Sequence, residues 1–426
     1  MRNAIANNLL LLIVFLLPWQ TRYIFSIQEI AGAPSEFGVL SVYVVEVLVM
    51  VAYMLRGGIL TSPEMRNLIR AGYFFLAVSF FSLSFSDFFL PGAALLIHVF
   101  AAYIFFLLLI DSRTDFFGAL HAFLFGLIGP AVLGIAQFFL GESPASTFLG
   151  IAVRNAQTLG DSVVALESVR VLRAYGSFGH PNIFGGYLLV AILLMFFLAY
   201  RSFKKKQSFW LLFSSALFSF VLMITFSRSA WVGLFVGISF FLLVSFLRKE
   251  KFRKHIRSVI VVLLLTILGS AVVLNPYVGA RFMPTSSSAD HSVEERVSQY
   301  EFIDEIILAK PLLGHGPGSY SFVSEVVDFG KSVYDYQPIH NVLLLLLAEV
   351  GVVGFGFLFW MLMEIDTFNK KGTKSFIGRL SLSIGISVLV LTLFDHYLWT
   401  QWSGLALCAF VFFLLVGLPR EDESMT

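Results

Sequence analysis

Residues 208–247 read SFWLLFSSALFSFVLMITFSRSAWVGLFVGISFFLLVSFL, which is two apolar runs separated only by Ser227-Arg228-Ser229. Each run approaches the length of about 20 apolar residues that a helix needs to cross the hydrocarbon core of a bilayer. Because almost no loop joins the two runs, the chain must cross, turn at once and return. This stretch therefore predicts a protein that crosses a membrane more than once.

Similar apolar runs recur on both sides of this stretch. Hydrophobic residues make up 58% of the 426 residues and charged residues only 13%, whereas soluble domains carry roughly a quarter charged residues. We therefore expect an all-α polytopic membrane protein with one membrane domain over residues 1–426. The 12 expected spanning helices lie within residues 5–25, 37–55, 68–86, 91–110, 116–140, 182–200, 208–226, 229–247, 258–275, 341–363, 376–394 and 398–418.

The basic residues test this order of spans, because cytoplasmic loops of membrane proteins are enriched in lysine and arginine. With the N-terminus in the cytoplasm, the inner segments hold 20 of the 29 basic residues and the outer segments hold 9. This orientation places both termini in the cytoplasm. It places two long connections, residues 141–181 and 276–340, on the external face. We expect the second one to contain short helices and to cover the site.

Two arginines on the external side indicate a site for an anion. Arg228 lies between two spans, where a charge is costly unless it faces protein, water or an anion, and Arg173 begins the polar stretch that leads into the sixth span. A guanidinium group offers a planar fork of donors that suits phosphate oxygens. The alternatives are that Arg228 extends to lipid headgroups and that Arg173 is a solvated loop charge.

A histidine lies at the entry of the tenth expected span. His340 and Asn341 directly precede its apolar run, and Glu349 lies nine residues further on, about 13 Å deeper along a helix. A neutral imidazole can accept a proton from a hydroxyl, although a helix-entry histidine that only bonds to backbone is an equal alternative. Glu349, and Glu46 in the second expected span, are slightly better explained as structural ties between helices than as catalytic groups.

The large external connection contains two further patterns. Residues 293–309 have the period of an amphipathic helix, in which Arg296 shares a face with Tyr300 and Ile303. The glycine-rich run at residues 311–320 that follows is only weak evidence for a phosphate site, because it lacks the lysine of a nucleotide-binding loop. No pair of external histidines has the spacing of a helical metal motif, and Cys408 is the one cysteine, so we expect no metal site.

Four motifs in this order resemble those of the O-antigen ligase and O-antigen polymerase family of bacterial membrane glycosyltransferases. The resemblance covers about residues 170–355. It rests on Arg173 with Gly176-Ser177-Phe178 and Pro181-Asn182, on Phe226-Ser227-Arg228-Ser229-Ala230, on Pro311 to Gly318, and on His340-Asn341 with Glu349-Val350-Gly351.

The resemblance implies a GT-C-like helical fold that needs no metal or other cofactor. It implies a donor glycan joined through pyrophosphate to undecaprenol, in the bacterial inner membrane, with the site on the periplasmic or external face. The acceptor is a glycan, a lipid or a protein, and the sequence leaves ligation, polymerisation and protein glycosylation open. No nucleic acid is implied. By position, the catalytic base is His340, the pyrophosphate-binding residues are Arg173, Arg228 and Arg296, and the supporting residues are Asn182, Tyr320, Asn341 and Glu349.

Two other functions compete with a glycosyltransferase. A flippase or transporter for lipid-linked oligosaccharides also suits 12 spans and a cationic cavity, but it should carry charge along a path to both faces, and repeats of the matched kind are not visible. A non-catalytic partner of a glycan export machine would not require His340 together with two arginines. The sequence favours the enzyme.

Overall fold

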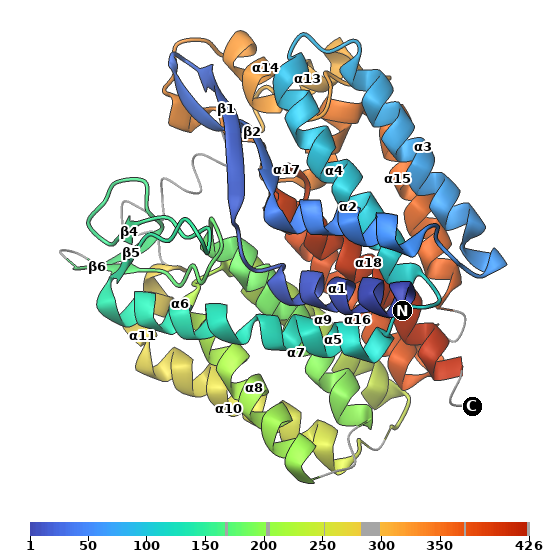
Figure 1. Cartoon of the computed structure of the whole chain (residues 1–426). Helices are drawn as coiled ribbons and strands as arrows, with labels where there is room; N and C mark the ends of the chain where they lie inside the picture. Colours follow the sequence, from blue (N-terminus) through green and yellow to red (C-terminus); the bar gives the residue numbers. More distant parts are fainter. Residues whose placement is uncertain (167–168, 202–204, 251, 283–298, 370–371, 424–426) are drawn as a thin grey trace.

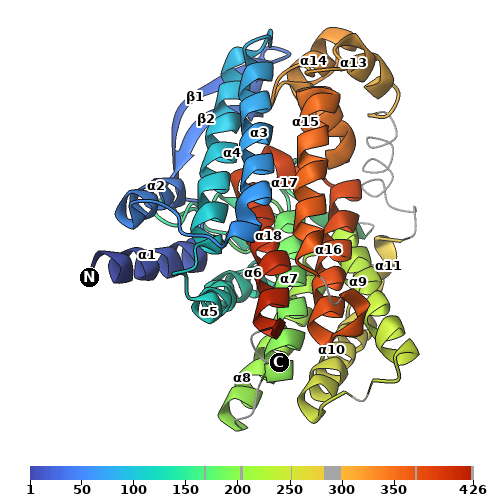
Figure 2. The same cartoon turned by 90° about the vertical axis from the view of Figure 1, so that its right-hand side faces the viewer.

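The computed structural model describes residues 1–426 apart from 167–168, 202–204, 251, 283–298, 370–371 and 424–426. Long helices packed side by side make up most of the molecule (Figures 1 and 2). In the described residues, eight helices are long and apolar enough to cross a membrane. They are α4 (Phe89–Ile110), α5 continued by α6 (Phe116–Gly126 and Ile128–Leu140), α7 (Pro181–Arg201), α9 (Arg228–Leu247), α10 (Lys254–Val273), α15 (Val342–Thr367), α16 (Phe376–Phe394) and α18 (Trp402–Glu423).

Four more helices occupy the remaining ranges that the sequence predicted to span. They are shorter or more polar than the eight: α1 (Arg2–Leu16), α2 (Val44–Arg56), α3 (Arg66–Leu83) and α8 (Lys205–Ile224). Every predicted range therefore contains a helix, and the predicted class, an all-α polytopic membrane protein, is confirmed.

The first two predicted spans were wrong at one boundary each. Residues 17–25 and 37–43 are not helical, because strands β1 (Arg22–Ile30) and β2 (Ala33–Tyr43) form an antiparallel hairpin between α1 and α2. Hydrophobicity alone does not separate a strand from a helix in a short apolar run. The turn residues Ala31 and Gly32 both have positive φ, 52° and 71°, as a two-residue hairpin turn requires. The hairpin reaches the end of the molecule where α13 and α14 lie (Figures 1 and 2).

Both long connections contain short elements. Residues 141–181 form two small antiparallel pairs, β3 (Glu142–Ser143) with β4 (Arg154–Asn155) and β5 (Val163–Leu166) with β6 (Val169–Leu172). The larger connection contains α11 (Asn275–Ala280), α13 (Ile303–Ala309) and α14 (Tyr320–Val327). The helix predicted over 293–309 is shorter: residues 299–302 are turn and bend, α13 begins at Ile303, and 293–298 lie outside the described residues. The remaining short helices are η1 (Pro63–Met65), η2 (Val333–Asp335), η3 (Gly372–Lys374) and α17 (Tyr397–Thr400).

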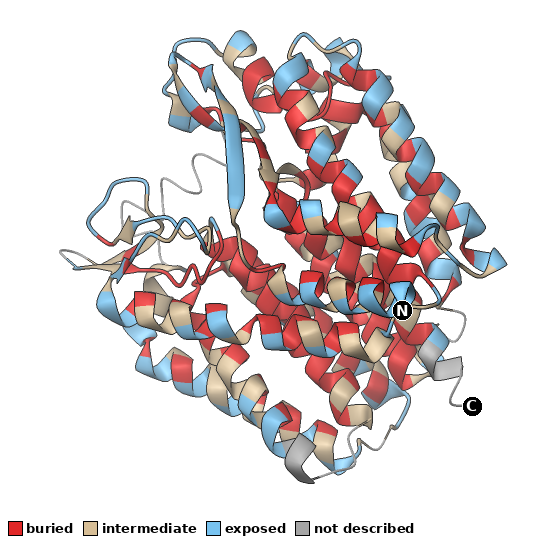
Figure 3. Ribbon diagram, in the orientation of Figure 1, coloured by how far each residue is buried: buried red, intermediate tan, exposed pale blue. Residues whose placement is uncertain are grey.

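Helix α7 lies at the centre of the bundle. Almost all of its side chains are buried, from Pro181 to Ala199, and the ribbon there is continuously red in Figure 3. Because these side chains are buried on all sides, other helices rather than lipid surround α7. Its first residues, Pro181 and Asn182, are thereby held fixed between the other spans.

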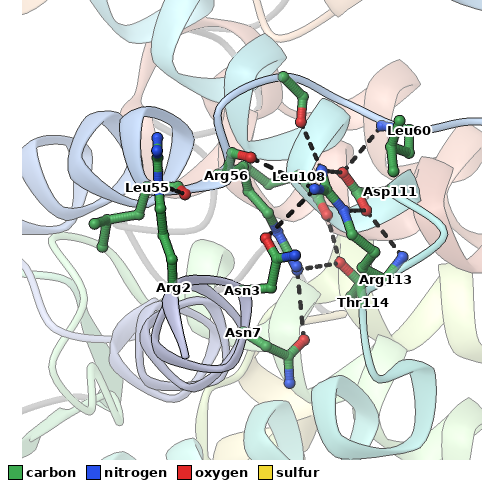
Figure 4. A network of polar contacts seen from close by, with 11 residues as sticks. Arg2, Asn3, Asn7, Leu55, Arg56, Leu60, Leu108, Asp111, Arg113 and Thr114 are labelled. Atoms are coloured by element: carbon green, nitrogen blue, oxygen red, sulfur yellow. Dashed lines mark hydrogen bonds and ion pairs between the residues drawn. The ribbon is translucent and has the colours of Figure 1, made fainter.

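A polar cluster ties α1, α2 and the turn after α4 together (Figure 4). Arg56 at the end of α2 donates to Thr114 Oγ1 at 3.0 Å, and Arg113 forms an ion pair with Asp111. Asp111 also accepts the backbone N–H of Leu60 at 3.1 Å. Arg56 and Asp111 are buried. Both oxygens of Asp111 accept hydrogen bonds, whereas Nε and Nη1 of Arg56 are buried without a hydrogen-bond partner among the described residues.

Helix α15 is interrupted near its middle, and the glycine-rich loop closes the interruption. Gly351 has φ 65° and ψ −175°, which is not helical. The carbonyls of Ala348 and Glu349 accept the N–H groups of His315 and Gly316, both at 2.9 Å. In the other direction, the loop carbonyl of Pro311 accepts the N–H of Val352 at 2.9 Å. The loop thus replaces the hydrogen bonds that the break in the helix removes.

Close approach explains the glycines at this junction. A Cβ on Gly351 would lie 2.3 Å from the Leu312 carbonyl oxygen, and one on Gly314 would lie 2.4 Å from the Glu349 carbonyl. Gly314, Gly316 and Gly318 all have positive φ, between 69° and 104°. Only glycine adopts this backbone without strain.

We predict that Gly351→Ala destabilises the protein. Only glycine readily adopts the Gly351 backbone, with φ 65° and ψ −175°, and it costs an alanine about 1–3 kcal/mol. The added methyl group also meets the Leu312 carbonyl. Thermal melting in detergent measures the effect. Gly356→Ala is the matched control, because a Cβ at Gly356 in the same helix has no heavy atom within 4 Å. Equal melting temperatures for the two variants would contradict this account of the break.

Candidate active site

A polar cavity of about 290 Å³ lies where the hairpin, α4, the start of α7, α15 and the α16–α18 junction meet. Most of its polar side chains come from segments that are distant in the sequence. The charged, amide and imidazole side chains among its lining are Gln20, Arg22, Glu36, His98, Arg154, His180, Asn182, Gln337, His340, Glu349, Asp395, His396 and Gln401.

His340 lies on this cavity beside Asp395 and His396. One side-chain nitrogen or oxygen atom from each of the three residues lies within 4.8 Å of those from the other two. The rings of His340 and His396 meet edge to face with centroids 5.0 Å apart. Asp395 and His396 are buried, and His340 is half-buried. Two imidazoles and a carboxylate in contact can hold and pass a proton.

The same three groups are of the kind that can hold a metal ion. A histidine pair with helical spacing was the sequence pattern expected of a metal site. This cluster lacks that pattern because its residues come from two separate helix entries. Asp395 already accepts hydrogen bonds at both oxygens, from the Asn182 amide at 2.7 Å and from the His396 backbone N–H at 3.2 Å. Each carboxylate oxygen has two lone pairs, so the chemistry of this cluster suits both an acid–base network and a metal site.

Asn182 connects this cluster to the first predicted arginine. Its amide donates to Asp395 Oδ2, and its Oδ1 accepts from Arg173 Nη2 at 2.7 Å. Arg173 is buried and also donates through Nε to the Thr225 carbonyl at 2.7 Å. Arg173 is therefore not a solvated loop charge. It lies against the turn that carries Arg228.

Arg228 lies apart from the cavity. It is the first residue of α9 and is half-buried, and its Nη1 lies 3.5 Å from the Arg281 carbonyl oxygen. Ser227 caps the helix by accepting the N–H of Ala230. A Cβ on Gly185 would lie 3.0 Å from the Ser227 Cβ, so this glycine allows α7 to pass close to the turn. Arg228 is not one of the described side chains that line the cavity.

Two predicted supporting residues, Asn341 and Glu349, have structural roles. Asn341 caps α15, because its side chain accepts the N–H groups of Leu343 and Leu344. Buried Glu349 accepts the N–H groups of Gly318 at 2.7 Å and Tyr320 at 3.2 Å. The Trp399 indole donates to it at 2.6 Å. Glu349 thus ties α15, the glycine-rich loop and α17 together.

Tyr320 is buried at the start of α14. Arg296, the remaining predicted residue, lies outside the described residues.

Glu46 has a comparable structural role. Its carboxylate accepts the backbone N–H of Tyr43 at 2.8 Å and lies 2.6 Å from His98 Nδ1. The pair joins α2 to α4, which agrees with the expected tie between helices. His98 also lines the cavity.

Sequence reasoning missed several residues of this cavity. The clearest omission is Asp395-His396, a polar pair in the short interval between two apolar runs, 376–394 and 398–418. That position was the available signal, because a charge confined between two spans is expected to face protein or water. No sequence pattern marked Arg154 as a residue of the cavity. It forms an ion pair with Asp161 at 2.8 Å and lies over the Tyr175 ring.

Burial dominates the electrostatics on the hairpin side. It raises the pKa of Glu36, although the positive charges of Arg154 and Arg22 act in the opposite direction. Arg22 donates to the Tyr43 hydroxyl at 3.1 Å. This side of the cavity therefore presents two guanidinium groups and a carboxyl group that binds its proton more readily than usual.

The helices and the polar cavity together define the class: a polytopic helical membrane protein with a polar site between its helix entries. Residues 211–359 match the model of the O-antigen ligase family. The similarity indicated by the motifs is thereby confirmed over a stretch that contains Arg228, the glycine-rich loop, His340 and Glu349. The match supports a membrane glycosyltransferase of the O-antigen ligase or polymerase type. A comparison with curated proteins gave no match.

We predict that His180 makes the fold sensitive to acid. Burial and the positive charge of Arg173 lower its pKa well below the usual value. The neutral ring accepts the N–H of Asn182 at Nδ1, 3.1 Å away, at the start of α7, and protonation removes this acceptor. The unfolded chain therefore binds more protons, so stability falls as the pH drops below about 6.5.

The test compares melting temperatures at pH 7.5 and pH 5.5 in detergent. His180→Asn keeps an acceptor suited to a helix start but does not titrate, so its melting temperature should fall less than that of the wild type. An identical fall in both proteins would rule out His180 as the source.

Proposed function

We propose that this protein transfers a glycan from undecaprenyl pyrophosphate to an acceptor hydroxyl, with inversion at the anomeric carbon and without a metal. The observation that carries the proposal is His340 on a polar cavity beside Asp395 and His396, in a stretch that matches O-antigen ligases. The acceptor is a glycan, a lipid or a protein.

His340 acts as the general base. It removes the proton from the acceptor hydroxyl while the oxygen attacks the anomeric carbon, and the bond to the pyrophosphate breaks. A proton acceptor placed in this way typically contributes a factor of about 10²–10⁴ to the rate. Asp395 and His396 lie beside it, where a carboxylate stabilises the imidazolium that forms.

The arginines stabilise the charge on the leaving pyrophosphate. Arg228 lies at the N-terminus of α9 beside Arg281, and Arg173 lies behind the same turn through its bond to Thr225. Fixed positive groups and a helix N-terminus lower the energy of a developing anion without reorganisation. We assign Arg228 as the direct contact, Arg173 as its buried support, and Arg296 as a further contact from the external connection.

An apolar groove supplies a path for the lipid tail. A cavity of about 520 Å³ lies between α3, α4, α15, α16 and α18, and its lining includes Asn369 and Trp399. Trp399 also bonds to Glu349, which lines the polar cavity. An apolar groove that ends beside a polar cavity suits a ligand with a long hydrocarbon chain and a polar head.

We place the protein in the bacterial inner membrane with both termini in the cytoplasm. The basic inner segments support this orientation. In the structure, α13, α14 and the tip of the hairpin gather at one end, away from the chain ends (Figures 1 and 2). The site then opens to the external face, where the lipid-linked donor is presented.

We predict that His340→Ala abolishes transfer. Purified protein in nanodiscs receives a pyrophosphate-linked oligosaccharide and candidate acceptors in the presence of EDTA, and mass spectrometry follows the glycan product and released undecaprenyl pyrophosphate. The rate should fall by about 10²-fold or more in the variant. His121→Ala is the control, because His121 lies outside the polar cavity and contacts the Phe117 carbonyl.

Turnover of the wild type in EDTA supports the metal-independent enzyme. Turnover that requires an added divalent cation would refute the metal-independent part. No turnover with any acceptor, together with unchanged glycan export in cells that carry His340→Ala, would favour the transporter instead.

We predict that Arg228→Lys impairs transfer more than it impairs stability. Lysine keeps the charge but loses the planar fork that grips two oxygens, so the rate should fall about tenfold or more, as expected for the loss of a charge-assisted hydrogen bond. The same assay and a melting curve measure the two effects. A transfer rate equal to that of the wild type would show that Arg228 does not grip the pyrophosphate with its fork.

A further inference from the structure

Gln299 contacts the proposed base from the large external connection. Its Oε1 lies 2.9 Å from His340 Nδ1 and 3.2 Å from the His340 backbone nitrogen. The segment is held in place by α13, which begins four residues later. Ile303 and Ile306 on α13 are buried in the core, and the Ile306 carbonyl oxygen lies 2.8 Å from His315 Nε2.

The two contacts fix the chemistry of both side chains. A backbone N–H can only donate, so the atom of Gln299 that faces it must be the amide oxygen. An amide oxygen can only accept, so His340 Nδ1 must carry a hydrogen. In this tautomer of the neutral imidazole the free lone pair lies on Nε2. A proton is therefore accepted at Nε2.

We propose that Gln299 is a positioning residue that holds His340 in the Nδ1–H tautomer and so makes Nε2 the base. This inference rests on the proposed function. Gln299 acts only through His340. Because two hydrogen bonds converge on one oxygen, they fix the ring orientation as well as the tautomer.

The neutrality of the amide has a specific effect. A carboxylate in the same place would stabilise the imidazolium and raise the pKa of the histidine. The chain uses such a pair elsewhere, where Glu46 lies 2.6 Å from His98 Nδ1. At His340 an amide orients the ring without adding a negative charge on the Nδ1 side.

Other titratable groups also face His340. Asp395 and His396 lie next to it. They directly precede the first residue of α17, and His396 is its N-cap. The remaining groups that share the cavity come from the hairpin, α4, the 141–181 connection and α15. They are Arg22, Glu36, His98, Arg154, His180 and Glu349. They are the same in the wild type and in a Gln299 variant, so a difference between the two reports the substitution at Gln299.

The first test is the pH dependence of the transfer rate. In Gln299→Glu, the added carboxylate should raise the pKa of His340, so the midpoint of the low-pH limb of kcat should move upward by about one pH unit or more. Gln299→Leu should lower kcat at all pH values while the KM for the donor stays the same. Gln157→Glu is the matched control, because Gln157 is exposed and lies outside the cavity.

The second test reads the tautomer without any turnover. Nitrogen-15 spectra of histidine-labelled protein identify His340 by the signal that His340→Ala lacks. The wild type should show a protonated Nδ1, and Gln299→Leu should show a mixture of tautomers.

The outcomes separate this inference from the proposed function. Two outcomes would overturn the role of Gln299 alone while the wild type still turns over. One is a low-pH limb that does not move in Gln299→Glu, and the other is a wild-type His340 that carries its hydrogen on Nε2. Absence of turnover would overturn the enzyme, and the spectra would still decide whether Gln299 sets the tautomer.

Discussion

The interruption of α15 is the feature on which the rest of the site depends. At Gly351 the helix loses its own hydrogen bonds, and the glycine-rich loop replaces them. Glu349, two residues earlier, accepts the N–H groups of Gly318 and Tyr320 and the indole N–H of Trp399. A buried carboxylate is tolerated only when its oxygens are satisfied. This single residue therefore fixes the loop and α17, and with them His340 and His396, relative to one another.

Much of the fold could be predicted from the sequence, because the bilayer imposes a length and a composition on each span. His340 and Asn341 were recognisable for a similar local reason, since a polar pair before an apolar run marks a helix entry. The hairpin at residues 22–43 was missed because its apolar strands have the same hydrophobicity as a span. The glycine-rich run was only weak evidence for a phosphate site, and its glycines are explained by close packing: Gly314 lies against the backbone of α15, Gly316 against Ser86 and Gly318 against Pro91.

The site itself depends on contacts between distant segments, which a single sequence does not display. The position of Asp395 between two spans marks it in the sequence, but only the structure shows that Asn182 joins it to Arg173. The same network shows why the predicted arginines are not equivalent. Arg173 is buried and supports the turn, while Arg228 lies at the start of α9 and faces Arg281. The two arginines carry the same charge but differ in burial and in the groups that they contact.

Trp399 connects two compartments of the molecule. Trp399 lines the apolar groove, and its indole nitrogen donates a hydrogen bond to Glu349. Under the proposed function, a hydrocarbon chain that occupied the groove would contact the side chain that holds Glu349 and, through Glu349, the glycine-rich loop. Occupancy of the groove and the geometry of the polar end would then be coupled through one indole.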